Sequence, residues 1–386
     1  MTVLAAIALL AWLYLLAAHG RFWQAGPTLP AARPVRMPAV AVVVPARDEA
    51  DGVADALRSL LRQDYAGTLR VVLVDDGSRD GTGEIARGVA GEAASPAASV
   101  PREAAPGRLA VLSGLPRPPG WSGKLWAIAQ GIDAAGPAEL VLLTDADIIH
   151  EPGHLAALVA HAEAHDLDLV SEMVALRCET AAERALVPAF VFFFQLLYPF
   201  AWVNDPLRST AAAAGGTILI RRRALDRIGG IEVVCGALID DVALAGAVKR
   251  GGRIWLGHST LAVSRRAYPA AADVWRMVAR TAYVQLRRSP LLLAATIAGL
   301  ALVWLVPPAV ALAGEGAARW MGLAAWAGAS AAFVPTLRRF GLSPLRAPLL
   351  PLVAVFYMAA TIGSAFDHHR GRGVQWRGRR YGGADA

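Results

Sequence analysis

Residues 139–148 read ELVLLTDADI, a short apolar run that ends on two aspartates separated by one residue. An apolar run of four to eight residues that stops at polar residues is typical of a buried parallel strand. Two further runs, Ala39–Val44 and Val71–Val74, have the same character. Helix-like stretches lie near residues 50–63, 80–90 and 123–135. Strands that alternate with helices predict an α/β fold with a mainly parallel sheet and crossover helices.

The composition is apolar for a soluble protein, with 55% hydrophobic residues and a mean hydropathy of +0.42. An uncharged apolar run covers residues 3–18, and basic residues come only after it, at Arg21, Arg33 and Arg36. A cleaved signal peptide would need a basic segment before its apolar run. The pattern therefore predicts a transmembrane anchor in residues 1–20, followed by a cytoplasmic domain according to the positive-inside rule.

Apolar segments return after residue 290 and predict a C-terminal transmembrane region, 291–366, of two or three spans. Arginines lie in the loop 338–346 and in the basic tail 367–386. If all segments cross, that loop and the tail fall on opposite sides of the membrane, against the positive-inside rule. A re-entrant or interfacial segment would remove the conflict, so the number of spans stays open. The apolar segments are Leu291–Ala313, Trp320–Val334 and Ala347–Phe366.

Another apolar stretch, Leu186–Val203, lies within the α/β region and is rich in aromatic residues. Aromatic side chains favour the headgroup level of a bilayer, which predicts an interfacial helix over 186–203. A further membrane span is the alternative interpretation.

The charge balance and the cysteines indicate which binding partners and which cellular compartment to expect. Basic residues exceed acidic ones by 38 to 31, a net charge of +7, which suits the anionic cytoplasmic leaflet. Nucleic-acid binding is not expected, because the sequence carries no nucleic-acid motif. The two cysteines, Cys178 and Cys235, give neither metal-ligand spacing nor a disulfide framework, which suits a reducing cytosol. Protein partners stay unknown.

Asp145 and Asp147 directly follow the predicted strand Leu140–Leu143. Ligands of open α/β sheets bind at the carboxyl ends of the strands. An Asp-x-Asp pair at such a place can hold a hard divalent ion, Mg²⁺ or Mn²⁺, which in turn holds a diphosphate. A solvated acidic turn is the alternative, and the position after a buried strand favours the metal site.

Three further polar motifs follow strands or begin helices. Asp75 and Asp76, in the segment VDDGS, end the second strand, where a carboxylate can accept the N3–H of a uracil ring or cap the next helix. Lys124, in GWSGK, begins a helix and suits a diphosphate, although the spacing is not that of a P-loop. The segment Pro45–Glu49, which contains Asp48, follows the first strand and is a weak motif alone.

Asp240 and Asp241 precede an apolar helix in the segment IDDVAL. Adjacent carboxylates can simply cap a helix. In a sugar transferase, one of them can instead remove the proton of the acceptor hydroxyl, with a pKa tuned by its neighbour or by a metal.

Taken in this order and spacing, the five motifs resemble family 2 glycosyltransferases of the GT-A fold, over residues 39–290. The resemblance implies that Asp75 contacts uracil and that Asp145 and Asp147 bind the nucleotide and the metal. It further implies a diphosphate or sugar contact for Lys124 and a catalytic base at Asp241, the second residue of the acidic pair. The remaining positions that match the family's nucleotide-sugar or pocket segments are Pro45, Asp48, Glu49, Asp76, Gly215 and Gly216.

One family element departs from its pattern. Processive members carry Gln/Arg-x-x-Arg-Trp in a late helix, whereas this chain has Arg276 and Arg280, four residues apart and without the tryptophan. This argues against a polysaccharide synthase. Either arginine is a candidate nucleotide-sugar contact, with a membrane-surface contact as the alternative.

The pieces GWSGKLWA, TDADI, GGTILIRR and VWRMVARTAYVQL resemble the hopene-associated glycosyltransferases of bacterial hopanoid clusters. That resemblance implies a multi-pass protein of the bacterial inner membrane that transfers a sugar from a UDP-sugar to a lipid, a hopanoid, with inversion. Two alternatives stay open: a polyprenyl-phosphate glycosyltransferase, and a non-enzymic lipid-binding scaffold.

Overall fold

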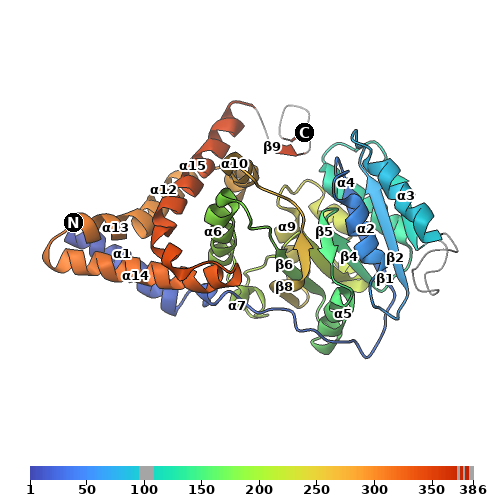
Figure 1. Cartoon of the computed structure of the whole chain (residues 1–386), viewed down its shortest axis with the longest axis horizontal. Helices are drawn as coiled ribbons and strands as arrows, with labels where there is room; N and C mark the ends of the chain where they lie inside the picture. Colours follow the sequence, from blue (N-terminus) through green and yellow to red (C-terminus); the bar gives the residue numbers. More distant parts are fainter. Residues whose placement is uncertain (95–107, 372–373, 377–378, 382–386) are drawn as a thin grey trace. The chain divides into compact units, whose positions relative to one another are not determined.

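The computed structural model describes residues 1–94, 108–371, 374–376 and 379–381. By contact, the chain divides into two compact units (Figure 1). The sheet unit comprises residues 27–176 and 203–266, and the helical unit comprises residues 1–26, 177–202 and those from Ala267 onward. Residues 95–107 and part of the basic tail 367–386 lie outside the described residues.

The sheet unit is built on one eight-stranded mixed sheet with the order β3-β2-β1-β4-β7-β6-β8-β5 (Figure 1). Strands β3, β2, β1 and β4 are parallel, β7 is antiparallel to both of its neighbours, and β6 pairs in parallel with β8. The predicted α/β fold is confirmed, and the three predicted strands are β1, β2 and β4. The strands are β1 (Val40–Ala46), β2 (Leu69–Asp75), β3 (Leu109–Ser113), β4 (Leu140–Thr144), β5 (Ile148–His150), β6 (Leu169–Ala175), β7 (Thr217–Arg221) and β8 (Ile254–Ser264).

Burial explains why these runs form strands. Every residue of β1 and of β4 is buried, as expected for the centre of a sheet that is covered on both faces. Leu57 and Leu60 of α2 and Leu155 and Leu158 of α5 belong to the same core. The helices of this unit are α2 (Val53–Leu61), α3 (Thr82–Ala94), α4 (Gly123–Ala135), α5 (His154–Ala164), α8 (Arg222–Arg227) and α9 (Asp240–Lys249), with a short 3₁₀ turn at Ile231–Val234.

The helical unit has its own core, in which Trp12, Phe192, Trp304 and Phe333 are buried together. Aromatic rings meet edge to face there, with 4.9 Å between the ring centroids of Trp12 and Trp304. Its helices are α1 (Thr2–Ala17), α6 (Ala181–Leu197), α10 (Ala271–Ala279), α11 (Ala282–Gln285), α12 (Pro290–Leu300), α13 (Val306–Ala313), α14 (Gly316–Arg339) and α15 (Leu350–His369), with the short turns η1 (Phe22–Gln24), η3 (Ala301–Leu305) and η4 (Pro344–Leu349), and with α7 (Phe200–Val203) at the boundary between the two units.

Three helices are long and apolar enough to cross a membrane: Pro290–Ala313, Gly316–Arg339 and Pro344–His369. They contain the three apolar segments expected from the sequence, and α1 is a shorter apolar helix of 16 residues. The stretch 186–203 forms the end of α6 and the whole of α7, and Phe192 of α6 is buried in the core of the helical unit. The anchor, the interfacial helix, the catalytic span 39–290 and the number of membrane spans remain predictions.

Candidate active site

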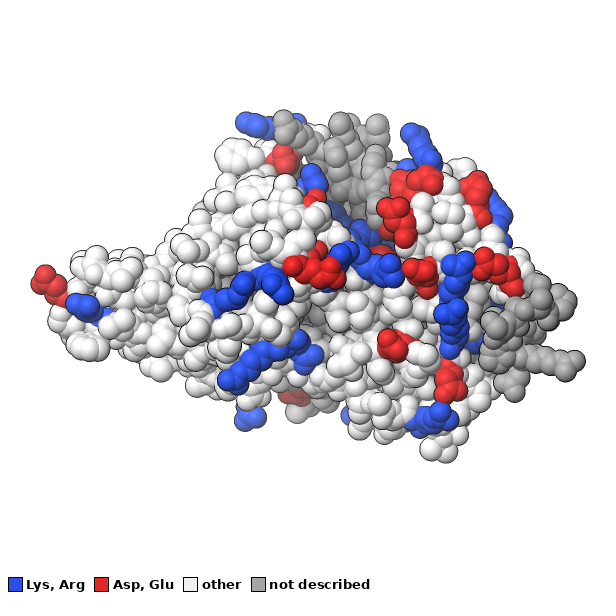
Figure 2. Space-filling view, viewed as in Figure 1, with Lys and Arg blue, Asp and Glu red and all other residues white. Residues whose placement is uncertain are grey.

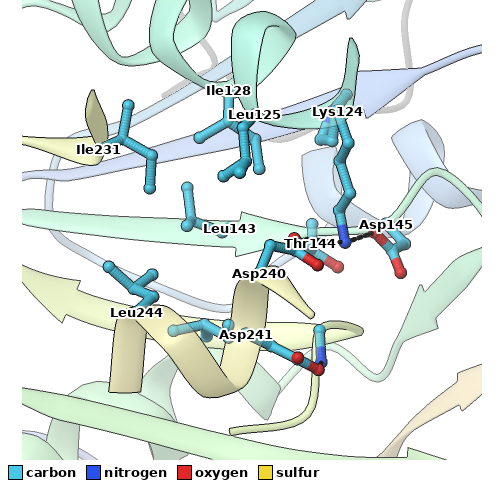
Figure 3. Close-up of a pocket in the computed structure, with 13 residues that line it drawn as sticks. Lys124, Leu125, Ile128, Leu143, Thr144, Asp145, Ile231, Asp240, Asp241 and Leu244 are labelled. Atoms are coloured by element: carbon cyan, nitrogen blue, oxygen red, sulfur yellow. Dashed lines mark hydrogen bonds and ion pairs between the residues drawn. The ribbon is translucent and has the colours of Figure 1, made fainter. Parts of the chain in front are cut away.

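Polar residues from sequence-distant segments meet at one edge of the sheet. Because β1, β2 and β4 are parallel neighbours, their carboxyl ends lie side by side. Pro45 and Asp75 come from the ends of β1 and β2, and Asp145 follows β4. The first turns of α4 and α9 add Lys124 and the pair Asp240 and Asp241, and a pocket forms between them (Figure 3). The lining residues are Pro45, Lys124, Leu125, Ile128, Leu143, Thr144, Asp145, Gly215, Ile218, Ile231, Asp240, Asp241 and Leu244.

Lys124 joins two of the acidic motifs. Its Nζ lies 3.0 Å from Asp145 Oδ1 and 3.3 Å from Asp240 Oδ2 (Figure 3). Burial alone would lower the pKa of Lys124, but Asp145, Asp240 and Asp241 together raise it above its ordinary value. Lys124 is therefore a fixed positive charge at the strand ends, where a diphosphate is expected to bind.

Asp241 is held by backbone donors at the start of α9. Gly215 N donates to Asp241 Oδ2 at 2.9 Å, and Val242 N donates to Oδ1 at 2.8 Å. Burial and the neighbouring charge of Asp240 raise the pKa of Asp241 to about 6, although Lys124 and the two backbone donors lower it. A carboxylate with this pKa is ionised at neutral pH and is a stronger base than an ordinary aspartate.

Gly215 lies where a side chain would crowd the site. A Cβ at this position would lie 3.2 Å from Lys124 Nζ and 3.4 Å from Asp241 Oδ2. At Gly216 a Cβ would instead meet the side chain of Val174 at 3.2 Å. The absence of a side chain at Gly215 leaves its backbone close to these charged groups, and the role of Gly215 and Gly216 in a donor or acceptor pocket remains a prediction.

The loops after β1 and β2 are tied to one another. Ser78 donates its hydroxyl to Asp75 Oδ1 at 2.5 Å, so one oxygen of Asp75 is used within its own turn. Asp48 Oδ1 accepts from the N–H of Arg79 at 2.9 Å, and the Glu49 N–H donates to Thr82 Oγ1 at 2.8 Å. Asp76 is buried, and its backbone N–H donates to Ala46 O at 2.8 Å. These contacts connect the loops that carry Asp48, Glu49 and Asp76, whose contacts with the nucleotide sugar remain predictions.

The Asp145-x-Asp147 motif fits a metal that binds together with its substrate. Asp147 Oδ2 accepts from Ser264 Oγ at 2.9 Å and from Arg266 Nε at 3.1 Å, and Arg266 Nη2 also donates to Glu49 Oε1 at 2.7 Å. In the described parts of the chain, no group of three His, Cys, Asp or Glu side chains could hold a metal by itself. Mg²⁺ is often bound by one or two carboxylates plus substrate phosphates, which is the arrangement that two aspartates can supply.

Arg276 and Arg280 belong to the helical unit, at the end of α10. Arg276 Nη2 donates to Asp273 Oδ1 at 2.5 Å on an exposed helix face. The site geometry above does not include either arginine, and their contact with the nucleotide sugar remains a prediction.

A buried polar chain behind Thr144 was not expected from the sequence. The Thr144 hydroxyl donates to Gly216 O at 2.8 Å and lies 3.1 Å from His150 Nε2. His150 Nδ1 lies 2.8 Å from His154 Nδ1, and His154 Nε2 lies 2.5 Å from Glu172 Oε2. The chain links β4, β5, α5 and β6, beginning at the residue before Asp145. The spacing of His150 and His154, four residues apart, is the only hint in the sequence, and Arg266 and Ser264 had none.

A profile of glycosyl transferase family 2 matches residues 41–229, a segment that carries β1, β2, β4 and the Asp145-x-Asp147 motif. This segment is a family 2 glycosyltransferase domain. The predicted family 2 domain is thereby confirmed for residues 41–229, and so is the predicted enzyme class, a glycosyltransferase.

Two similar proteins are also sugar transferases. Over 59 residues the chain is 51% identical to an N-acetylglucosaminyltransferase of Rhizobium meliloti (strain 1021), a match that spans only 14% of each protein. The mannosyltransferase PcManGT from Pyrobaculum calidifontis, solved in complex with GDP-Man and Mn²⁺, has a TM-score of 0.54 at 22% identity. The likeness covers 94% of this chain and 99% of the mannosyltransferase, so the two chains share a fold.

A second solved structure is similar over a smaller part of the chain. Glucosyl-3-phosphoglycerate synthase from Mycobacterium tuberculosis, in complex with Mn²⁺, UDP and phosphoglyceric acid, has a TM-score of 0.42 at 18% identity. The likeness covers 65% of this chain and 78% of that one.

Proposed function

We propose that the chain is a membrane-bound inverting glycosyltransferase that transfers a sugar from a UDP-sugar to a lipid acceptor, a hopanoid. The observation that carries the proposal is the position of Lys124 between Asp145 and Asp240, with Asp241 beside them at Gly215. A fixed cation, a metal-binding carboxylate pair and a raised-pKa carboxylate are the groups that single displacement from a nucleotide sugar requires.

The residues divide the reaction between them. Asp75 is the proposed uracil contact, and Mg²⁺ or Mn²⁺, held by Asp145 and Asp147, would neutralise charge on the departing diphosphate. Lys124 binds the same diphosphate. Asp241 takes the proton of the acceptor hydroxyl, whose oxygen forms the new bond to the anomeric carbon as the bond to UDP breaks. Attack from the opposite face inverts the configuration, and no enzymic nucleophile is needed.

The acceptor and the location follow from the apolar helices. Three helices long enough to cross a membrane support a lipid acceptor, because such an acceptor would lie in the same membrane as the chain. The arginines after α1, beginning with Arg21, support a cytoplasmic face of the bacterial inner membrane. A hopanoid is the proposed lipid because of the resemblance of GWSGKLWA and the other pieces to hopene-associated enzymes.

A polyprenyl-phosphate glycosyltransferase is the nearest second candidate. Its phosphate acceptor is already an anion, so it has less need of a base. The raised pKa of Asp241 favours the hydroxyl acceptor, because this pKa improves the carboxylate as a general base. A non-enzymic scaffold would have no use for the retained acidic residues at Asp145, Asp147 and Asp241.

Lipid profiling tests the acceptor directly. A deletion strain should lose one class of glycosylated lipid, and the wild-type gene should restore it, whereas Asp241→Asn should not. Asp226→Asn changes an exposed aspartate of the same sheet unit and is the matched control, which should restore the lipid. Accumulation of an unglycosylated hopanoid in the deletion strain supports the proposal. Loss of a polyprenyl-phosphate sugar, with hopanoids unchanged, would replace it with the second candidate.

A further inference from the structure

The membrane helices form a hairpin with a defined polarity. α13 packs along α14 so closely that a Cβ at Gly322 would lie 2.7 Å from Ala311 N. The turn between them carries Glu315, and Arg319 follows in the first turns of α14. The start of α12 therefore lies on the same side of a membrane as the end of α14. Arginines mark that side at both places: Arg287 and Arg288 before α12, and Arg338 and Arg339 at the end of α14.

The third apolar segment begins beside α14. η4 turns back along that helix, where Trp326 Nε1 donates to Pro348 O at 3.0 Å. Arg346 of η4 lies next to the first turns of α6, with its Nη1 3.5 Å from Arg184 O. The segment thus starts from the arginine-marked side and turns into α15 there.

The far end of α15 returns to the same side. Ser364 accepts from Tyr283 N at 3.2 Å and also donates to Ala279 O, so it holds the end of α15 against α10 and α11. A Cβ at Gly363 would lie 2.7 Å from the ring of Trp275. α11 ends only a few residues before α12 begins, and the exposed arginines Arg276 and Arg280 lie on α10 and directly after it. The end of α15 is thereby fixed at the level where α12 starts.

We infer that the segment from Pro344 to His369 does not cross the membrane but lies slanted within one leaflet. α15 has 20 residues, about 30 Å, so its length would allow a crossing and only its attachments prevent one. In Figure 1, α1 and α14 run alongside each other, whereas α15 runs across their direction.

The surface of α15 fits the headgroup and upper acyl region of an anionic leaflet. One face packs on α10 and α11, and the other exposes apolar side chains, among them Leu352, Val355 and Phe366. Arg346 and Arg370 flank the helix, at the level where lipid phosphates lie. With α15 in one leaflet, the arginines of the loop 338–346 and those of the tail lie on the same side of the membrane. This removes the conflict with the positive-inside rule that three crossings would create. Figure 2 shows few charged side chains over α1, α13 and α14, as is expected for helices that lie within a membrane.

Cysteine labelling tests the two ends of the segment. Single cysteines replace Glu315, Leu345 and Ala384 in a chain with Cys178→Ser and Cys235→Ser. In intact cells, an impermeant maleimide should give the same result for Leu345→Cys and Ala384→Cys and the opposite result for Glu315→Cys, whereas all three should react after permeabilisation. If Ala384→Cys behaves as Glu315→Cys does, the segment crosses and the inference is wrong.

Depth measurements give a test that does not depend on orientation. Nitroxide labels at Leu352 and Phe366 are 14 residues apart, about 21 Å along a helix. Labels at the exposed residues Ala317 and Ala331 of α14 are also 14 apart and serve as the matched control. In phosphatidylglycerol nanodiscs, the α14 pair should differ in depth by most of that length, and both α15 labels should stay in one leaflet. Labels on α15 that reach opposite leaflets would overturn the inference.

Discussion

Asp240 and Asp241 are adjacent in the sequence, but they have different partners. Asp240 lies 3.3 Å from the Lys124 ammonium, whereas Asp241 accepts from the backbone of Gly215 and Val242. Asp240 therefore helps to position the Lys124 ammonium. Asp241 has the carboxylate of raised pKa that is proposed to take the proton of the acceptor hydroxyl.

Replacement of the proposed base tests this division. Asp241→Asn keeps the shape and removes the base, so kcat should fall by about 10²–10⁴-fold, the usual contribution of general base catalysis. UDP affinity should change little, because Asp75, Asp145 and Asp147 are the proposed donor contacts. Asp240→Asn should lower kcat less. Single-turnover transfer and UDP titration measure the two effects. Near-wild-type turnover in Asp241→Asn would move the base elsewhere, and a joint loss of turnover and UDP binding would make Asp241 structural.

The pH profile follows from the same pair. The base acts when ionised, so kcat/KM should rise with pH and level off above the Asp241 pKa of about 6. The charge of Asp240 contributes to that raised pKa, so Asp240→Asn should shift the rising limb to lower pH. Initial rates between pH 5 and 8 measure the limb. An unmoved limb in Asp240→Asn would show that another group titrates.

Asp147 gives a prediction about metal binding. Arg266 already lies against its Oδ2, so a metal should bind weakly without the diphosphate that supplies further ligands. Calorimetry should show tighter UDP binding with Mn²⁺ or Mg²⁺ than with EDTA, and Asp147→Ala should behave as EDTA does. Asp226→Asn should leave the metal effect intact. Equal UDP affinity with and without metal would contradict the metal assignment.

At the level of elements, the buried chain from Thr144 to Glu172 connects β4, α5 and β6. Breaking a buried polar pair by removing one partner typically costs about 3–5 kcal/mol. Glu172→Ala leaves His154 Nε2 without its partner and should clearly lower the thermal unfolding midpoint. Glu172→Gln keeps a polar partner and should restore part of the loss. Glu151→Ala, an exposed glutamate in the turn before α5, should be neutral. Equal midpoints for Glu172→Ala and wild type would contradict the role.

The same chain predicts acid sensitivity. Burial, together with the charge of His154, lowers the pKa of His150 well below 6.5. The folded protein then keeps His150 neutral while the unfolded chain gains a proton below about pH 6.5. Stability should therefore fall as pH drops below 6.5. Unfolding midpoints at pH 7.5 and 5.5 measure this, and a smaller difference is expected in His150→Gln.

The elements that sequence could predict are those defined by local pattern. β1, β2 and β4 are continuous apolar runs, and the aspartates at their ends follow directly in the chain, so their shared edge could be deduced. The partners of those aspartates could not. Ser264 and Arg266 reach Asp147 only because β8 ends near it, and His154 meets Glu172 only because α5 packs against β6. Such pairs depend on tertiary packing, which no local pattern encodes.

For the whole molecule, composition separates the apolar helices from the sheet, but the chain does not divide at one point. Residues 177–202 lie between β6 and β7 in the sequence and belong to the helical unit. Their apolar, aromatic character was visible, and their packing against Trp304 and Phe333 was not. Charge counts could show a conflict in topology, whereas its resolution needed the contacts of α15.

The last prediction concerns the side of the membrane on which the sheet unit lies. Arg21 follows α1 directly, just before the sheet unit begins at residue 27, and Arg287 and Arg288 precede α12, so the end of α1 and the start of α12 both carry positive charge. The positive-inside rule then places that unit in the cytoplasm, the compartment in which a UDP-sugar donor is expected. Ser99→Cys, in a chain with Cys178→Ser and Cys235→Ser, should react with an impermeant maleimide only after the cells are permeabilised. Glu315→Cys should react in intact cells and shows that the reagent reaches the outer side. Labelling of Ser99→Cys in intact cells would put the catalytic domain outside and remove the basis for a UDP-sugar donor.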